Sequence, residues 1–176
     1  MCGKTCLIKT FISGEFEENF VPTLFDTYET KIEVDGRTIS LNIFDTAASE
    51  TYDRLIPLYY PATDVFLVCF AIDLPASFES IEHRWIPEIR SHCPGIPILL
   101  VGNRSDLRDD ECSLEYLKKR GKKPISTIQA RALARKIGAV DYIECSAKRK
   151  ENVEHVFLTA MKEAEKKAGR SKCTVM

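Results

Sequence analysis

Residue types that bind phosphate stand at the start of the chain, in Met1-Cys2-Gly3-Lys4-Thr5-Cys6. The triplet Gly3-Lys4-Thr5 matches the second half of the phosphate-binding loop G-x-x-x-x-G-K-[ST]. In that loop, main-chain N–H groups and a helix N-terminus surround the β-phosphate, the lysine neutralises the β- and γ-phosphates, and the hydroxyl holds Mg²⁺. Three such residues fall together by chance in many proteins, so the downstream segments must decide.

Composition excludes several classes of protein. The chain has 176 residues, of which 44% are hydrophobic and 29% charged, as expected for one compact domain. A net charge of −1 provides no general attraction for nucleic acid, and we expect no such partner. The seven cysteines lack C-x-x-C spacing, which favours free thiols over zinc or disulfides. No signal peptide or membrane-length apolar run is present, so we expect an intracellular chain whose membrane contact requires an attached group.

The first half of the chain predicts one helix and one hairpin. Apolar residues at helical spacing predict a helix from Lys4 to about Ile12, with the lysine and threonine in its first turn. An irregular loop follows at 15–24. Alternating polarity then predicts antiparallel strands at 28–34 and 38–44, joined by Asp35-Gly36.

The second half alternates strand and helix, with crossovers long enough for parallel strands. The charged stretch 107–124 is interpreted as a solvated helical excursion. These patterns predict an α/β fold of three layers: a mostly parallel twisted sheet with one antiparallel edge strand and helices on both faces. The expected strands lie at 64–72, 96–102 and 140–145, and the expected helices at 75–92, 126–137 and 152–167.

Five short motifs follow one another in a recognisable order. They are Gly3-Lys4-Thr5, Thr23, Asp45-Thr46-Ala47, Asn103-Arg104-Ser105-Asp106 and Ser146-Ala147-Lys148. This series resembles the Ras-like small GTPases. The resemblance implies the P-loop NTPase version of the three-layer fold, GTP and GDP as ligands, Mg²⁺ as cofactor and GTP hydrolysis as activity.

Other segments resemble the Rho branch of that family. They are Val21-Pro22-Thr23, Tyr52-Asp53-Arg54-Leu55, Cys93-Pro94, the charged insert after Asp106 and Cys173-Thr174-Val175-Met176. The resemblance covers essentially the whole chain.

The resemblance assigns a role to each motif. Thr5 and Thr23 would give oxygen ligands to Mg²⁺, and Asp45 would hold the ion through water. Asp106 would accept two hydrogen bonds from guanine N1 and N2, which adenine cannot give. Phe16 would pack against the base, although an ordinary core ring remains an alternative for it. The implied nucleotide-binding set is Gly3, Lys4, Thr5, Cys6, Phe16, Thr23, Ala48, Asn103, Arg104, Asp106, Ser146, Ala147 and Lys148.

Three positions depart from the family pattern. The family stretch D-T-A-G-Q-E reads D-T-A-A-S-E here, so Ser49 replaces the glutamine that aligns the attacking water. We expect Ser49, which together with Thr23 occupies a catalytic position, to slow hydrolysis because its side chain is too short. Ala48 replaces a glycine and should hinder the change between nucleotide states. Arg104 replaces a lysine and should lower guanine affinity somewhat.

The family's first strand and leading G-x-G would lie before Met1. A sheet without about five buried apolar residues forfeits roughly 7–15 kcal/mol, which is comparable to the ~5–15 kcal/mol stability of a domain. We therefore expect residues 1–168, an incomplete G domain, to fold poorly alone. Either the natural chain begins upstream or the sequence is a degraded gene copy.

The leading functional hypothesis is a membrane-anchored Rho-like switch, a monomer with weak hydrolysis that acts on actin organisation. It would meet exchange factors, GTPase-activating proteins and effectors through 15–28 and 45–61. The alternative is a pseudo-GTPase scaffold or decoy without turnover.

Residues 169–176 are interpreted as a tail for membrane attachment. Cys173-Thr174-Val175-Met176 has the C-a-a-X pattern, in which methionine favours a farnesyl group on Cys173. One lipid binds membranes only marginally, so a basic cluster is needed as a second signal. We expect the protein in the cytoplasm and on the cytoplasmic face of membranes, chiefly the plasma membrane. The basic residues are Lys166, Lys167, Arg170 and Lys172.

Overall fold

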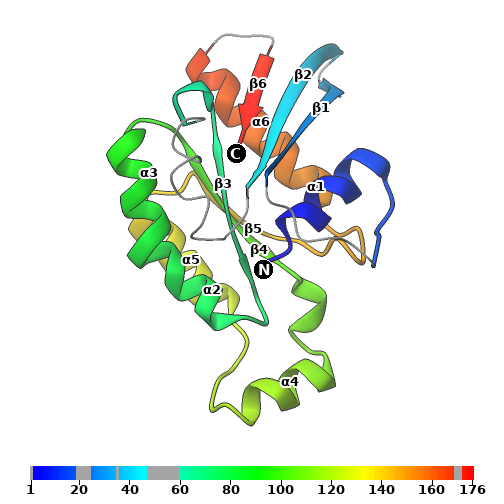
Figure 1. The fold of residues 1–176 in the computed structure, drawn as a ribbon, viewed down its shortest axis with the longest axis vertical. Coiled ribbons are helices and arrows are strands. Elements are labelled where there is room, and N and C mark those ends of the chain that lie inside the picture. The colour runs from blue at the N-terminus through cyan, green and yellow to red at the C-terminus, as the bar shows by residue number, and fades with distance from the viewer. Residues whose placement is uncertain (1, 19–24, 35, 47–59, 169–171) are drawn as a thin grey trace.

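The computed structural model describes residues 2–18, 25–34, 36–46, 60–168 and 172–176, and its layers are seen in Figure 1. Two three-stranded sheets, in the orders β1-β2-β6 and β3-β4-β5, form its centre. The strands are β1 (Phe25–Val34), β2 (Arg37–Thr46), β3 (Phe66–Ala71), β4 (Ile98–Asn103), β5 (Asp141–Glu144) and β6 (Lys172–Val175). The helices are α1 (Lys4–Ser13), α2 (Pro75–Ser80), η4 (Ile81–Trp85), α3 (Ile86–His92), α4 (Glu111–Lys118), α5 (Thr127–Ile137) and α6 (Val153–Ala168), with short 3₁₀ turns η3 (Tyr60–Ala62) and η5 (Ser105–Leu107).

Strand directions confirm the predicted sheet. β1 pairs antiparallel with β2, whereas the β2–β6, β3–β4 and β4–β5 pairs are all parallel. The predicted hairpin is therefore correct. β1 begins at Phe25 rather than at 28 and ends at Val34 as predicted, and β2 runs from Arg37 to Thr46 rather than over 38–44.

Helices cover both faces of the sheet because its inner strands are apolar on both sides. In β4, Ile98 and Leu100 join a core with α2, α3 and α5, while Leu99 and Val101 join a core with α1 and α6. Figure 1 shows these two groups of helices on opposite sides of the strands, with α4 projecting from one end. The predicted three-layer fold is confirmed.

The helix expected over residues 75–92 is interrupted. The chain stays helical from Pro75 to His92, but η4 is a π-helical turn between α2 and α3. Pro87 lies in the first turn of α3. Because proline lacks an N–H and clashes with the preceding turn, a regular α-helix cannot pass through it, and the wider turn before Pro87 accommodates the ring.

β6 is the element that the sequence did not predict. Residues 172–175 were expected in a tail outside the domain, but they form a strand beside β2. A parallel bridge between Val65 and Val175 joins β6 to the start of β3. Within the described residues, β6 thus links the two sheets (Figure 1).

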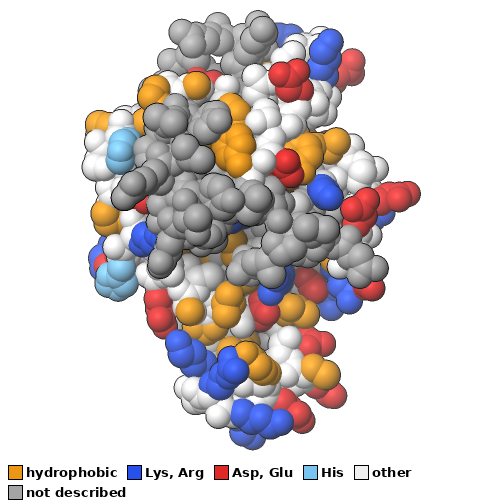
Figure 2. Space-filling model, viewed as in Figure 1, with side chains coloured by type: hydrophobic (Ala, Val, Ile, Leu, Met, Phe, Trp, Pro, Cys, Tyr) orange, Lys and Arg blue, Asp and Glu red, His pale blue; other side chains and the backbone are white. Residues whose placement is uncertain are grey.

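The described surface mixes both signs of charge. Figure 2 shows lysine and arginine side chains beside acidic ones over the α4 end of the molecule. The helix α4 begins after Asp110, whose carboxylate accepts the Ser113 N–H at 2.9 Å, and it confirms the predicted excursion. Among the described segments, no helix is both long and apolar enough to cross a bilayer.

Candidate functional site

The predicted phosphate-binding residues lie at the start of α1. Gly3 caps the helix with φ of 86°, a conformation that favours glycine, and its carbonyl accepts the Leu7 N–H at 3.0 Å. Lys4 and Thr5 therefore occupy the first helical turn, where main-chain N–H groups point out of the helix and its dipole attracts anions. This is the local geometry that a phosphate-binding loop requires.

Thr5 and Asp45 form a buried pair of hard oxygen donors. The Thr5 hydroxyl donates to Asp45 Oδ2 at 2.6 Å, which joins α1 to the end of β2. A hydroxyl that donates its proton to a carboxylate keeps lone pairs for a cation. Within the described ranges, no group of three or more His, Cys, Asp or Glu side chains could hold a metal. The chemistry of this pair suits Mg²⁺, which takes few protein ligands and binds substrate phosphates for the rest.

A second group of predicted residues surrounds a cavity of about 300 Å³. It lies beside the N-terminus of α1, at the ends of β4 and β5 from which the two later motifs extend. Parallel α/β sheets bind ligands at this carboxyl edge. The half-buried ring of Phe16 forms part of the wall. The lining residues are Gly3, Cys6, Phe16, Glu18, Asn103, Arg104, Asp106, Leu107, Ala147 and Lys148.

Asp106 is held in place by Ser146. The Ser146 hydroxyl, which is fully buried, donates to Asp106 Oδ1 at 2.5 Å and accepts the Arg149 N–H at 3.0 Å. The Ser105 N–H donates to the Cys145 carbonyl at 3.1 Å. The loop after β4 and the loop after β5 are therefore fastened to each other at the cavity, and Asp106 presents a carboxylate in a fixed position.

Asn103 joins three segments that are distant in sequence. Its Nδ2 donates to the Cys2 carbonyl at 2.9 Å, and its Oδ1 accepts the Cys145 thiol at 3.0 Å. Asn103 is buried, so both ends of its amide are satisfied by the protein itself. Its side chain frames the cavity by holding the segment before α1 against the ends of β4 and β5.

Arg104 adopts a left-handed conformation, with φ of 60°, and its guanidinium pairs with Asp73 at 3.2 Å. A Cβ placed on Gly3 would lie 3.7 Å from Arg104 Nε. The residue that replaces the family lysine is thus fixed between the cavity and the loop that follows β3.

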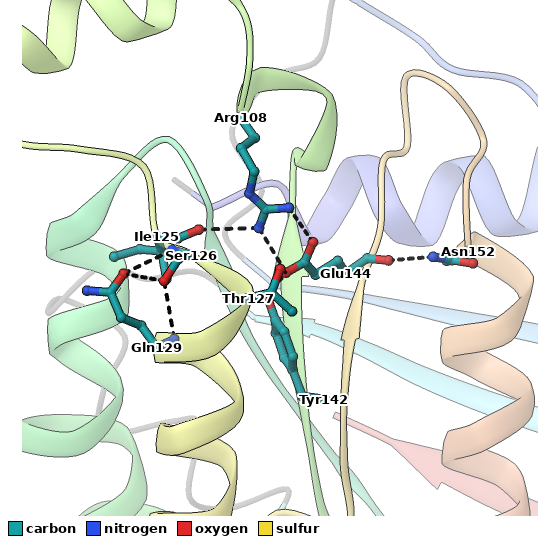
Figure 3. Close-up of polar contacts among 8 residues, drawn as sticks. All are labelled: Arg108, Ile125, Ser126, Thr127, Gln129, Tyr142, Glu144 and Asn152. Atoms are coloured by element: carbon teal, nitrogen blue, oxygen red, sulfur yellow. Dashed lines mark hydrogen bonds and ion pairs between the residues drawn. The ribbon is translucent and has the colours of Figure 1, made fainter.

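A polar network behind the cavity connects the same two loops (Figure 3). Arg108 donates to both carboxylate oxygens of Glu144, at 2.5 and 2.8 Å, and Glu144 Oε1 also accepts the Thr127 and Tyr142 hydroxyls at 2.7 and 2.8 Å. Burial raises the pKa of Glu144, but the hydrogen bonds from Arg108, Thr127 and Tyr142 outweigh it and the net pKa is lowered. Glu144 is therefore an anion at neutral pH.

Two thiols near the site, half-buried Cys6 and buried Cys145, have raised pKa values. Burial raises the pKa of Cys6, which lines the cavity, and raises that of Cys145 to about 12. A thiol rather than a thiolate is a poor nucleophile and a poor metal ligand. These cysteines line and pack the site without supplying chemistry to it.

The structure brings most of the predicted residues to these two places. Lys4 lies apart from the first cavity and lines a second one, of about 270 Å³, together with Thr46 and Met176. Thr23, Ala48 and Ser49 lie outside the described residues. The residues that sequence reasoning missed are Glu18 and Leu107 in the wall, and Arg108 and Glu144 behind it. The only signal in the sequence for Glu144 as the acceptor of this network is its position two residues before Ser146, in a motif already assigned to the site.

Comparison with known proteins agrees with this geometry. The Ras family matches residues 1–166. The GTP-binding protein RHO1 of Candida albicans is 46% identical over 179 residues, which cover 99% of this chain and 90% of that protein. The human Rho-related GTP-binding protein RhoB is 50% identical over 166 residues, covering 94% of this chain and 85% of that protein, and mouse RhoB gives the same values. The chain belongs to the Ras family of small GTPases and, within it, to the Rho proteins.

Proposed function

We propose that the chain is a Rho-like GTP-binding signalling protein that holds GTP or GDP across the two parts of the described site. The observation that carries this proposal is the fixed carboxylate of Asp106 on the rim of a base-sized cavity. Gly3 and Cys6 line the same cavity and stand at the start of α1. A base in the cavity would therefore leave the phosphates at the helix N-terminus.

Asp106 would select guanine. The Ser146 hydroxyl uses one acceptor site of Oδ1, and the carboxylate keeps further sites for the N1–H and N2–H donors of guanine. Adenine presents an acceptor at N1, so it would leave the carboxylate facing a lone pair. Phe16, Ala147 and Lys148 would border the base, with Asn103 and Arg104 holding the surrounding loops.

The phosphates and Mg²⁺ would lie at the opposite end. Lys4 would neutralise phosphate charge and Thr5 would give its hydroxyl oxygen to Mg²⁺, which neutralises charge on the transferred phosphoryl group when bound. Asp45 would fix the Thr5 hydroxyl and meet the ion through water. Thr23 is proposed as a further ligand and catalytic position.

We expect GTP hydrolysis to be weak. Ser49 lacks the carboxamide that aligns water, and Ala48 lacks the conformational freedom of glycine. The same substitutions favour one rival, a pseudo-GTPase that holds GTP without turnover and acts as a scaffold or decoy.

Partners and location follow from the family. Exchange factors, GTPase-activating proteins and effectors would bind at 15–28 and 45–61, and actin organisation would be the process controlled. A lipid on Cys173, supported by Lys166, Lys167, Arg170 and Lys172, would attach the protein to the cytoplasmic face of the plasma membrane.

The bound nucleotide tests this function. The protein would be purified in Mg²⁺ and denatured, and the released nucleotides identified by chromatography. GDP indicates turnover, GTP alone indicates a locked switch, and failure to retain or bind either contradicts the proposal. Thr5→Ala should lose Mg²⁺-dependent retention, whereas the control Thr10→Ala, a buried threonine on the same helix, should keep it.

A further inference from the structure

Two charged residues behind the base cavity belong to the same loops that carry Asp106 and Ser146. Arg108 caps the short turn η5 and lies two residues after Asp106. Glu144 ends β5 and lies two residues before Ser146. The described wall of the cavity contains neither Arg108 nor Glu144. They meet from the two loops (Figure 3), so any effect of this pair on a bound base must pass through the residues that line the cavity.

The contact between Arg108 and Glu144 fixes direction as well as distance. Two N–H groups of one planar guanidinium donate to the two oxygens of one carboxylate, which holds both groups in a common plane. By contrast, the single hydrogen bond from Ser146 to Asp106 allows rotation about it. Arg108 also donates to the Ile125 carbonyl, which joins the pair to the segment before α5. The orientation of the two loops therefore depends chiefly on this pair.

The carboxylate of Glu144 is fully engaged by its neighbours. It accepts four hydrogen bonds, two from Arg108 and one each from the hydroxyls of Thr127 and Tyr142. A carboxylate offers about four acceptor sites. The Glu144 carbonyl in addition accepts Nδ2 of Asn152 at 2.8 Å, which fastens the far end of the loop after β5. Glu144 thus holds other residues in place and does not itself meet a ligand.

Recognition of guanine by Asp106 requires orientation as well as charge. Guanine presents N1–H and an N2 amino group on one edge, and a carboxylate accepts both only when it faces that edge in the plane of the base. Hypoxanthine, the base of inosine nucleotides, has the N1–H but lacks the amino group. A correctly oriented carboxylate therefore binds guanine more tightly than hypoxanthine, and a rotated one loses this difference.

We propose that Arg108 and Glu144 are positioning residues, which hold Asp106 in the orientation that recognises the amino group of guanine. This inference rests on the proposed binding of guanine nucleotides and adds the residues that set the specificity of that site. Without the pair, the loops can turn about the remaining single bonds, and the carboxylate no longer faces both donors. A purely structural role would instead weaken the binding of both bases by the same factor.

The test compares the affinities of the full chain for GDP and IDP in the presence of Mg²⁺. Competition against a ribose-labelled fluorescent GDP measures both, and diphosphates avoid hydrolysis during the measurement. Arg108→Met removes the pair, whereas Arg108→Lys keeps the charge and loses the bidentate geometry, so the milder variant keeps the test decisive if the first does not fold. Arg131→Met is the matched control, because Arg131 is an exposed arginine of α5 outside the network.

We expect the natural chain and Arg131→Met to prefer GDP over IDP by roughly tenfold or more, the effect of one charge-assisted hydrogen bond. The preference should fall to roughly threefold or less in Arg108→Met and lie between these values in Arg108→Lys. Arg108 variants that bind GDP and IDP more weakly by the same factor, or with unchanged affinity, overturn the inference and leave the proposed function intact. A natural chain that binds neither nucleotide contradicts the proposed function itself, and the inference falls with it.

Discussion

Replacing Arg108 by methionine should destabilise the protein by about 2 kcal/mol. The substitution keeps an unbranched stem and removes two hydrogen bonds to Glu144, together with a bond to the Ile125 carbonyl at 3.2 Å. A bond to a charged group contributes about 1.5–3 kcal/mol when buried. The two side chains are 27% and 19% exposed, and Thr127 and Tyr142 still satisfy Glu144, so the lower end applies.

The effect should depend on pH with a definite sign. Because the net pKa of Glu144 is lowered in the folded protein, its contribution is present above the unfolded value of ~4.3 and is lost as pH falls through the folded pKa. In Arg108→Met, burial still raises the pKa of Glu144, but the hydrogen bonds from Arg108 no longer lower it. The stability difference between the two proteins should therefore shrink as pH falls from 7 towards 3.

Urea unfolding at several pH values measures this difference in the free energy of unfolding. In thermal unfolding, the same loss should lower Tm by ~4–8 °C. Lys136→Met is the matched control, since it removes an ion pair with Glu82 on the surface, where such pairs contribute little. An Arg108→Met protein that loses no more stability than Lys136→Met, or a difference that is constant with pH, would refute the reasoning.

Three further predictions use other parts of the chain. Single-turnover GTP hydrolysis should rise tenfold or more in Ala48→Gly/Ser49→Gln, and an unchanged rate would show that these residues are not the limit. Cys173→Ser should move the protein out of the membrane fraction of cells, and its retention there would place the anchor elsewhere. Gly102→Ala should cost about 1–3 kcal/mol in urea unfolding, because a Cβ there would lie 2.7 Å from Tyr142 Oη, and native stability would contradict that close contact.

Local patterns predicted most of the regular structure. The helix α1, the hairpin β1–β2 and the strands β3 to β5 follow from periodicity that depends only on nearby residues. The helix α5 adds a capping box, in which Ser126 and Gln129 satisfy each other's main-chain groups. Family motifs then predicted that Gly3, Asn103, Asp106 and Ala147 meet, and one cavity brings these residues together.

Contacts between distant segments could not be predicted from those patterns. β6 is only four residues long, and its position depends on parallel neighbours at residues 40–43 and 64–67. A segment of four residues is too short to show a strand pattern in the sequence, so it is interpreted as a tail until its neighbouring strands are known. The hydrogen bonds between Arg108 and Glu144 and between Asn103 and Cys2 also join distant segments, so the sequence did not indicate them.

Nucleotide selectivity of Asp106→Asn tests the central claim most directly. An asparagine Oδ1 can still accept the Ser146 hydroxyl at the cavity rim, which turns the amide donor towards the base. Competition binding with guanine, adenine and xanthine nucleotides would compare this variant with the natural chain and with Asp109→Asn, an exposed aspartate nearby. We predict that the natural chain and Asp109→Asn prefer guanine and that Asp106→Asn prefers xanthine. An Asp106→Asn protein that keeps its preference for GTP would contradict the account.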